Sequence, residues 1–363
     1  MNLLIKDIAD VINISVSNPS ESGYDVFVGL EHYDIGEPVI TRYGSTQMLT
    51  TACKKFQSGD ILLARRNVYL RRAGLVEFDG LTSGDSIVIR VKNAIAIEGI
   101  DAAAIKRLLP FILNTNAFWD YANTNSDGTM SKRLSPQMLL DYEFDIPELS
   151  EQKSLADKLW AAYKLKTAKL KLIAAINEMV KSQFIEMFSK NTPSVKLESI
   201  VDLLDDKRKP INDAERSEMK DGPLYPYYGA IGIVDYINQF ITDETLLCIS
   251  EDCGNYGPGE ASSYIITGKA WVNNHAHIVR PKEGICDITY LHNYLRVTDL
   301  LPFVSGTTRK KLTQKAMLDL DISLPSIEEQ QCFVHICEQA DKSKFELKKS
   351  IEKIDNVMKA LMQ

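Results

Sequence analysis

The stretch DGTMSKRLSPQMLLDYEFDIPELSEQ, residues 127–152, decides the fold, because residues 305–330 repeat it as SGTTRKKLTQKAMLDLDISLPSIEEQ. The two copies align without a gap at an offset of 178 residues, so that Leu134 matches Leu312 and Gln152 matches Gln330. Each copy leads directly into a long stretch with the apolar spacing of a helix. A duplicated unit closed by a long helix predicts a two-fold pseudosymmetric molecule that presents two similar surfaces.

The repeat extends toward the start of each half. Three shorter matches keep the same order while their offset varies: residues 5–10 match 197–202 at 192, residues 60–63 match 244–247 at 184, and residues 87–90 match 277–280 at 190. Surface loops gain and lose residues more readily than framework elements do, which explains the varying offset. The chain is therefore expected to contain the same domain twice.

Length and composition place the chain among ordinary globular proteins with more than one domain. Its 363 residues are 45% hydrophobic and 25% charged, and a chain of this length usually forms two or three domains. The sequence has no run of 18 apolar residues and no basic leader followed by an apolar core, so neither a membrane span nor a signal peptide is expected. The six scattered cysteines suit a reduced, cytoplasmic protein.

The net charge of −7 is a weak argument against binding of nucleic acid, because contact with phosphates depends on local clusters of cations. Such clusters occur at residues 65–66, 71–72, 132–133, 207–209 and 309–311. Two of them, Lys132-Arg133 and Lys310-Lys311, occupy equivalent positions of the repeat. A single basic doublet is usually a solvated surface, whereas two in register favour a shared task.

Between these landmarks, each half contains short β-branched runs separated by glycine and aspartate. The runs predict strands at residues 26–30, 60–64 and 86–91 in the first half and at 245–249, 263–266 and 275–279 in the second. Short helices are expected at residues 101–120 and 287–298. Each half is thus predicted to be a compact α/β (α+β) domain with a curled, mostly antiparallel sheet.

The two long helices each carry a single apolar stripe. The first stripe is broken only by Lys166 and comprises Leu155, Leu159, Ala162, Leu170, Ile173, Ile176, Val180, Phe184 and Met187; the second comprises Leu347, Ile351, Ile354, Met358 and Leu361. One narrow stripe implies one main partner. The simplest arrangement packs the two helices against each other as an antiparallel coiled coil, and the alternative is a coiled coil between two chains. A helix of about 40 residues would span roughly 60 Å.

The ends of the repeated block also contain helix-start signals. Ser326 and Glu329, directly after Pro325, are typical of a capping box. Glu151-Gln152-Lys153 resembles the acidic-x-Lys element of a metal-dependent nuclease, but its repeat partner is Glu329-Gln330-Gln331. Because the lysine is missing there and an acid at a helix start is explained by capping, we reject a nuclease site.

Other catalytic constellations are equally weak. The glycine-rich residues 254–259 lack the Lys-Ser/Thr of a phosphate-binding loop and predict an ordinary loop. The sequence has no Asn-Pro-Pro-aromatic stretch of the kind used by amino-methyltransferases, so no methyl-transfer site is expected. Cys248, Cys253, His275 and His277 could be assembled into a zinc site only with loose spacing, so core cysteines and a structural or DNA-facing histidine are the preferred interpretation.

A family resemblance rests on four stretches of the sequence. They are the two repeated blocks, the stretch GPLYPYYGAIG at residues 222–232 and the stretch SGDILLAR at residues 58–65. The chain resembles, over its whole length, the specificity (S) subunit of a Type I restriction–modification system. The first half matches the Tyr-Pro-x-Tyr-Gly pattern of the second poorly, as expected of domains that diverged to recognise different sequences.

The resemblance implies a division of the chain and a set of partners. Residues 1–149 and 191–325 would be target-recognition domains, each reading half of a bipartite, asymmetric site in double-stranded DNA. Residues 150–190 and 326–363 would be spacer helices that also dock two modification (M) subunits, which carry S-adenosylmethionine and methylate adenine. Restriction (R) subunits would join for cleavage. The S subunit itself would catalyse nothing and would hold neither cofactor nor metal.

Arginine, asparagine, glutamine and tyrosine side chains are suited to base edges, and lysine and arginine to phosphates. Candidates for base contacts in the first domain are Arg65, Arg66, Asn67, Arg71 and Arg72, on the loop after the central strand. Those in the second domain are Tyr227, Tyr228, Asn255, Tyr256, Asn273, Asn274 and His275. Candidates for phosphate contacts are Lys132, Arg133, Arg309, Lys310 and Lys311.

Two alternatives from other classes remain open at this point. The chain could be a non-catalytic protein-binding scaffold or adaptor with two α/β domains on a coiled-coil rod. It could also be a fragment of a fused restriction–methylation enzyme, which the missing methyl-transfer motif disfavours.

Overall fold

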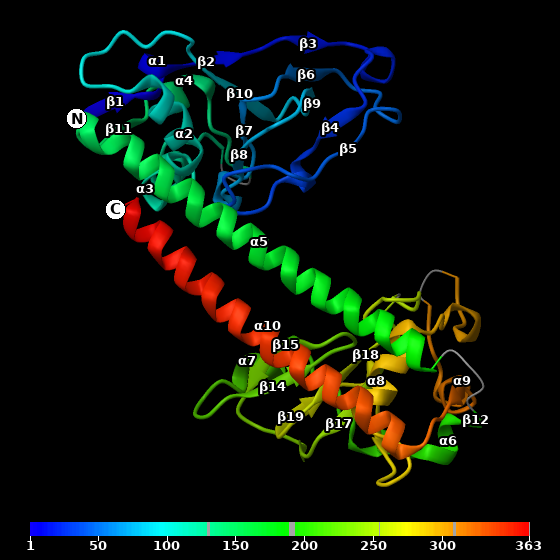
Figure 1. The fold of residues 1–363 in the computed structure, drawn as a ribbon. Helices are drawn as coiled ribbons and strands as arrows, with labels where there is room; N and C mark the ends of the chain where they lie inside the picture. Colours follow the sequence, from blue (N-terminus) through cyan, green and yellow to red (C-terminus); the bar gives the residue numbers. More distant parts are fainter. Residues whose placement is uncertain (129–130, 189–192, 254, 308–309, 363) are drawn as a thin grey trace. The chain divides into compact units, whose positions relative to one another are not determined.

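The computed structural model describes residues 1–128, 131–188, 193–253, 255–307 and 310–362. The chain divides into two compact units. Unit 1 comprises residues 1–168 together with the C-terminal segment from residue 350, and unit 2 comprises residues 169–349. The first unit is therefore completed by the end of the last helix (Figure 1).

Unit 1 contains two main sheets and a small third one. The four-stranded sheet has the order β2-β10-β7-β8 and is antiparallel throughout. The five-stranded sheet has the order β3-β6-β9-β4-β5, in which only β4 and β9 pair in parallel. The strands are β1 (Asn2–Leu4), β2 (Ala9–Ile12), β3 (Ser15–Val16), β4 (Val26–Val28), β5 (Gly44–Ser45), β6 (Cys53–Phe56), β7 (Ile61–Ala64), β8 (Ala73–Leu75), β9 (Gly80–Thr82), β10 (Ser86–Val91) and β11 (Glu143–Asp145), the last paired with β1.

Unit 2 repeats most of this arrangement, but its described residues contain no counterpart of β3. Its first sheet has the order β13-β20-β17-β18, and its second has the order β15-β14-β19-β16 with β14 and β19 parallel. The strands are β12 (Ser194–Lys196), β13 (Val201–Leu203), β14 (Tyr225–Tyr228), β15 (Ile233–Ile237), β16 (Thr242–Asp243), β17 (Leu246–Ser250), β18 (Ser263–Ile266), β19 (Lys269–Val272), β20 (Ala276–Pro281) and β21 (Asp321–Ser323), the last paired with β12. The predicted fold class, α/β (α+β) with mostly antiparallel sheets, long helices and an internal repeat, is confirmed.

The central strands form the core because both of their faces are covered. All four residues of β7 and all five of β17 are buried, as expected for apolar runs without alternation. On one side lie α2 (Ala102–Ile112) and α3 (Asn116–Thr124) in unit 1, and α8 (Ile288–Val297) in unit 2. The single helix predicted at residues 101–120 is wrong, because Thr115 accepts a hydrogen bond from the amide of Phe118 (3.2 Å) and starts a second helix.

Among the shorter helices, Ile5–Ile8 recurs as Leu197–Ile200, and Pro136–Leu140 recurs as Gln314–Leu318. The shorter helices are α1 (Ile5–Ile8), α4 (Pro136–Leu140), α6 (Leu197–Ile200), α7 (Asp213–Glu218) and α9 (Gln314–Leu318), with single 3₁₀ turns η1 (Pro19–Glu21), η2 (Leu30–His32), η3 (Val68–Leu70), η4 (Asp205–Lys207) and η5 (Leu301–Phe303).

The strand register allows positions of the two units to be compared one by one. Arg90 faces Asp10 on β2, and Arg280 faces Asp202 on β13, so the offsets of 190 and 192 are confirmed. Ala64 faces Ser86, whereas Ser250 faces Ala276. This pairing gives an offset of 186 along β7 and β17, so the predicted offset of 184 is wrong by two residues.

The predicted offset was wrong because it aligned two acidic residues that form similar ion pairs in the two units but lie at different distances from the strand. Asp60 accepts two hydrogen bonds from Arg90, both of 2.7 Å. Glu244 makes the equivalent pair with Arg280. Glu244 lies two residues before β17, whereas Asp60 directly precedes β7, so the similar residue types are not at equivalent strand positions.

The two long helices are α5 (Leu149–Phe188) and α10 (Ile327–Leu361). Within unit 2 they run antiparallel: Lys344 donates to Asn177 (3.3 Å), and farther along α5 the ring of Phe184 contacts Phe333, with 5.1 Å between centroids. Within unit 1, Lys166 of α5 lies 2.9 Å from Asp355 of α10. None of the helices in the described ranges is both long and apolar enough to cross a membrane.

The predicted apolar stripe of α5 needs two corrections. Leu170 and Met187 are exposed, and Phe188 is buried in place of Met187. Phe188 packs on Tyr290 and Phe333, with centroid distances of 5.0 and 5.8 Å. The predicted stripe placed Met187 three residues after Phe184. Phe188 lies four residues after Phe184 and therefore on the same face of the helix, where it is the buried residue.

Each copy of the repeated block ends in a glutamine, and the buried side-chain amide of that residue explains why it is repeated. Gln152 accepts from the amide of Asp101 and donates to the carbonyls of Gly99 and Pro147. Asp101 in turn caps α2. Gln152 has no exposed surface, so the repeated glutamine fixes the helix-start loop. The adjacent capping box of Ser326 and Glu329 is confirmed by hydrogen bonds of 2.9 and 3.3 Å.

Candidate nucleic-acid interface

In unit 1, the loop after β7 contains most of the predicted base-contacting residues. Asn67 and Arg71 have positive φ values of 55° and 52°, unlike all other non-glycine residues that the structure describes. Such left-handed residues are costly and concentrate at ligand-binding loops. They bracket η3 and turn the chain sharply on both sides of it.

Arg72 stabilises this loop from inside. Its guanidinium donates to the carbonyl oxygens of Leu30 (3.0 Å) and Arg66 (3.1 Å). Burial lowers the pKa of Arg72. Both of these donors are used within the unit, so Arg72 has a structural role, and we withdraw it from the predicted base contacts. Arg71 remains at the surface, where it donates to Asn116 (2.7 Å).

The loop meets the basic doublet of the repeated block. The amide of Asn67 donates to the carbonyl of Lys132 (2.8 Å), and the amide of Leu134 donates to the carbonyl of Arg65 (2.9 Å). The side chain of Arg66 donates to the hydroxyl of Ser131 (3.0 Å). Two regions predicted separately, one for bases and one for phosphates, therefore form one continuous surface.

Two arginines of this surface pair with one carboxylate, and two further basic residues lie close by. Arg66 lies 3.6 Å from Asp85, and Arg133 lies 3.7 Å from it. Burial and the neighbouring Arg65 both lower the pKa of Lys54, while Asp85 raises it. We name Lys54, Arg65, Arg66, Arg133 and Asp85 the Asp85 cluster. Lys54 and Asp85 were not predicted, because they lie far from the basic doublets in sequence.

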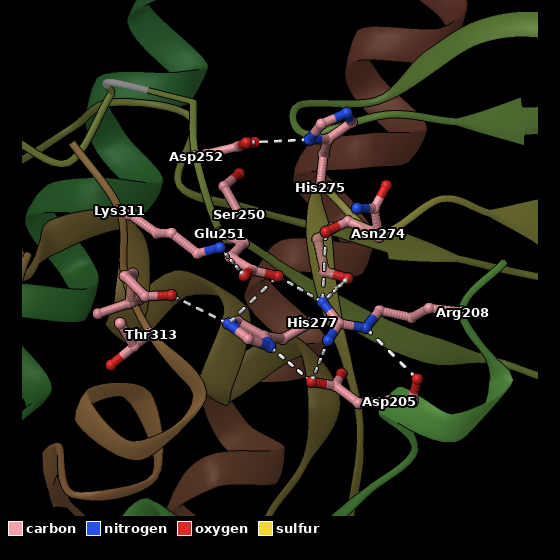
Figure 2. A network of polar contacts seen from close by, with 12 residues as sticks. Asp205, Arg208, Ser250, Glu251, Asp252, Asn274, His275, His277, Lys311 and Thr313 are labelled. Carbon is pink, nitrogen blue, oxygen red and sulfur yellow. Dashed lines mark hydrogen bonds and ion pairs between the residues drawn. The ribbon is translucent and has the colours of Figure 1, made fainter. Parts of the chain in front are cut away.

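In unit 2, the equivalent loop joins a polar network around Glu251 (Figure 2). Arg208 lies 2.5 Å from Glu251, and Lys311 lies 2.7 Å from it. Arg208 also pairs with Asp205 at 2.9 Å. Burial alone would raise the pKa of Glu251, but hydrogen bonds from Lys311 and Arg208 outweigh it, so the pKa is lowered.

His277 lies at the centre of this network and is almost fully buried. Its Nδ1 is 2.7 Å from the carboxylate of Asp205, and its Nε2 is 3.0 Å from the carbonyl oxygen of Leu312. Both neighbours are acceptors, and the two ring nitrogens hold the side chain between them. We name Asp205, Arg208, Glu251, His277 and Lys311 the Glu251 network.

The surface beside this network contains three of the predicted polar residues. His275 lies 2.9 Å from Asp252, and its amide donates to the side chain of Asn273 (2.8 Å). Asn273 is buried and shapes this turn, so we withdraw it as a base contact. Asn274 is exposed at the tip of the turn.

Two predicted base contacts of unit 2 are wrong because the rings are buried. Tyr227 lies on β14, where its hydroxyl interacts with the backbone of Ile211 and its ring is covered by Arg216. Tyr256 is fully buried, and its hydroxyl accepts from the amide of Cys253 (3.3 Å). Burial raises the pKa of Tyr256. Neither side chain is available to a base.

The remaining predicted residues lie at or near the surface. Tyr228 is half-buried and stacks on Tyr264, with 5.5 Å between centroids. Asn255 is half-buried, and Lys310 is exposed. Lys132 is exposed and donates to the carbonyl of Asn123 (2.9 Å). Arg309 lies outside the described residues.

The geometry also bears on the catalytic alternatives. Among the residues whose placement is described, no group of three histidine, cysteine or acidic side chains could hold a metal ion. Cys248 is fully buried within β17, and burial raises the pKa of its thiol to about 12. A thiol of that kind is a poor source of the thiolate that zinc requires.

Comparison with known proteins gives a match for the second half. Residues 190–356 match the family model of the Type I restriction modification DNA specificity domain.

This part of the chain is similar to Type I restriction–modification DNA specificity domains.

The chain is also similar to one protein of known description. A protein of Haemophilus influenzae described as a type I restriction enzyme specificity subunit is 31% identical over 143 residues, which cover 39% of this chain and 35% of that protein. The matched segment thus spans about a third of the relative's own length. The resemblance to Type I specificity subunits is confirmed by these two comparisons.

Solved structures extend the likeness of the fold to the whole chain. The S subunit of a Type-I restriction-modification system from M. genitalium covers 100% of this chain and 96% of its own, with a TM-score of 0.55 and 13% identity. A chain from a structure concerned with complex assembly and conformational transition of the type I R-M system gives a TM-score of 0.54 with 16% identity and the same coverage. At these identities the likeness is one of fold.

Proposed function

We propose that the chain is the DNA-recognition subunit of a Type I restriction–modification complex and that it binds a bipartite, asymmetric site in double-stranded DNA. The observation that supports this most is the repeated junction of two loops. In each unit, the loop after the central strand is hydrogen-bonded to the basic end of the repeated block, through Leu134 in one and Leu312 in the other. A duplicated surface of this kind suits a target with two separate elements.

Within each surface we assign different tasks to different residues. In unit 1, Arg65, Arg66, Lys132 and Arg133 would contact phosphates, and in unit 2 Lys310 would do so; such contacts orient a protein on the duplex without selecting sequence. Other side chains at or near the surface would contact base edges, at roughly 1–3 kcal/mol of discrimination for each good bidentate pair. We propose for this task Asn67 and Arg71 in unit 1, and Tyr228, Asn255, Asn274 and His275 in unit 2.

The long helices would have two tasks in the complex. We propose that residues 150–190 and 326–363 separate the two target-recognition domains, residues 1–149 and 191–325, and so set the number of unread base pairs. The same helices would dock two M subunits, which supply S-adenosylmethionine and the methyl transfer, and R subunits would join for cleavage. The S subunit would contribute recognition alone.

A protein-binding adaptor remains the second candidate, and one observation favours it. The hairpin of β14 and β15 exposes Ile231, Ile233, Val234 and Tyr236. Exposed apolar residues beside the edge strand β15 are a common feature of protein-binding surfaces. In an adaptor, substitutions in this hairpin would abolish complex formation, whereas substitutions in the two loop surfaces would have no effect on DNA.

The decisive experiment is long-read sequencing of host DNA for methylated adenine, with and without the gene. We expect one methylated motif with two specified elements and a fixed unread spacer, and we expect it to disappear on deletion. Complementation with an Asn67→Ala variant should relax one element only, and an Asn274→Ala variant should relax the other. An unchanged set of methylated motifs after deletion would contradict the proposal.

A further inference from the structure

The two candidate surfaces are equivalent in backbone but not in charge. The amide of Arg65 donates to the carbonyl of Asp85 (2.9 Å), and the amide of Glu251 donates to the carbonyl of His275 (2.9 Å). Arg65 therefore corresponds to Glu251, and Asp85 corresponds to His275. The following position is Arg66 in unit 1 and Asp252 in unit 2. Two adjacent cations of one surface are replaced by two carboxylates in the other.

The surrounding residues do not restore the balance. The Asp85 cluster has four cations and a single carboxylate. In the Glu251 network, Arg208 and Lys311 face the two carboxylates of Asp205 and Glu251. Among the described residues, the Asp85 cluster thus has an excess of positive charge, whereas each cation of the Glu251 network is matched by a carboxylate.

The geometry of the ion pairs adds to the difference. Arg66 and Arg133 are about half exposed, at 46% and 49%, and lie 3.6 and 3.7 Å from Asp85. Ion pairs of this length at the surface contribute little and are easily exchanged. In unit 2, by contrast, Glu251 is nearly buried and holds Arg208 and Lys311 at 2.5 and 2.7 Å. Of these two sets, only Arg66 and Arg133 can readily exchange their ion pairs with Asp85 for contacts with a DNA phosphate.

We propose that phosphate contact is unequal between the two surfaces: the Asp85 cluster of unit 1 neutralises DNA phosphates, whereas the Glu251 network of unit 2 neutralises few or none and contacts the duplex through uncharged donors and acceptors. The inference rests on the proposed function, since it concerns the same duplex. It assigns Lys54, Arg65, Arg66 and Arg133 as the cations that contact the phosphates, with Asp85 as their partner in the free protein.

Salt dependence is the measurement that separates the two surfaces. Each phosphate neutralised on duplex DNA adds about 0.9 to the slope of log K against log salt. An Arg66→Gln, Arg133→Gln variant should therefore lower that slope by about 1.8. Between 50 and 200 mM salt its affinity should fall about twelvefold less than that of the wild type. Both side chains are about half exposed, so the fold should be kept.

The matched variant in unit 2 is Lys311→Gln, since Lys311 is the repeat counterpart of Arg133. Because Lys311→Gln alone would leave Glu251 with one partner fewer, a Lys311→Gln, Glu251→Gln variant is measured with it. Both should change the slope by less than about 0.5. Arg42→Gln is the control within unit 1, since Arg42 is exposed, pairs with Asp34 and lies outside the cluster.

The full chain with its modification subunit is titrated with a duplex that carries the methylated motif and with a random-sequence duplex. The inference would be overturned, with specific binding intact, by either of two results. One is that the unit 1 and unit 2 variants lower the slope of log K against log salt equally, and the other is that the Arg66→Gln, Arg133→Gln variant leaves it unchanged. Salt-dependent binding without preference for the motif would instead refute the proposed function. Absence of binding to either duplex would refute both.

Discussion

Gln152 and Gln330 lie at the same position of the repeat and make the same three hydrogen bonds, each within its own unit. Each side-chain oxygen accepts from the amide of a helix-capping aspartate, Asp101 or Asp287, and each side-chain nitrogen donates to two carbonyls. Both glutamines are fully buried. The glutamine that ends the repeated block therefore couples the start of a long helix to the start of a short one.

Replacing Gln152 by alanine should destabilise unit 1. The amide of Asp101 and the carbonyls of Gly99 and Pro147 would lose their buried partner, at a cost of about 1–3 kcal/mol in free energy of unfolding. Hydrogen–deuterium exchange of peptides from α2 measures the effect locally. Gln137→Ala is the control, because Gln137 is exposed. Equal exchange in both variants would show that the buried amide is dispensable.

Acid should weaken unit 2 through His292. Burial lowers the pKa of His292 to about 4, and its Nδ1 lies 2.9 Å from the hydroxyl of Ser263. The unfolded histidine takes up a proton near pH 6.5, whereas the folded one does so only near pH 4. The unfolded state thus binds more protons in this window, so stability falls by up to about 3 kcal/mol as the pH drops from 6.5 to 4.

A His292→Gln variant tests this dependence. Its free energy of unfolding should fall less steeply than that of the wild type between pH 6.5 and 4, measured by denaturant titration at several pH values. His335→Gln serves as the control, since His335 is exposed. Parallel curves for His292→Gln and the wild type would exclude His292 as the source.

Lys166 should stabilise unit 1 through two carboxylates. It interrupts the apolar stripe of α5, yet its ammonium lies 2.6 Å from Glu37 and 2.9 Å from Asp355, and its side chain is only 14% exposed. Replacing it by methionine would leave two acids facing each other without a cation. Because both acids are partly exposed, we expect a loss of about 1–2 kcal/mol in free energy of unfolding.

Neutralising the acids distinguishes this explanation from lost packing. A Lys166→Met, Glu37→Gln, Asp355→Asn variant should recover most of the stability lost by Lys166→Met in thermal unfolding. No recovery would mean that the ammonium contributes through something other than these two pairs. Lys171→Met, at an exposed position of the same helix, controls for the added methionine.

Asn274 should affect sequence choice without affecting stability. It is exposed at the tip of a turn that Asn273 and His275 hold together. We expect Asn274→Ala to relax recognition of one base pair, at about 1–3 kcal/mol of lost discrimination, with no change in unfolding. Methylation of a substrate library reads out the first effect and denaturant titration the second. Tyr256→Phe should behave in the opposite way, because Tyr256 is buried.

The sequence predicted the repeat, the long helices and most central strands because those features depend on local periodicity. The capping residues Ser326 and Glu329 are only three residues apart, so a local pattern was enough to identify them. The two candidate surfaces were predicted in part. Arg66 and Arg133 are both in basic doublets, and the structure brings them to the same carboxylate.

The features that could not be predicted from the sequence are contacts between residues far apart in the chain and the burial of individual side chains. Asp85 meets Arg133 across 48 residues of chain, and His277 meets Asp205 across 72, distances at which no spacing rule applies. Tyr227 and Tyr256 belong to motifs that suggested a DNA contact. An aromatic ring can serve equally as a core residue, and only the packing of β14 and β17 shows which role it has.

The completion of unit 1 by residues from position 350 onward has a consequence for biosynthesis. Met358 and Leu361 pack against the core of the unit that the ribosome makes first. All of unit 2 must be translated before they emerge, which takes on the order of ten seconds or more at about 5–20 residues per second. The core of unit 1 is therefore incomplete during translation of unit 2. Part of its apolar surface stays accessible to chaperones until the last turns of α10 leave the ribosomal exit tunnel.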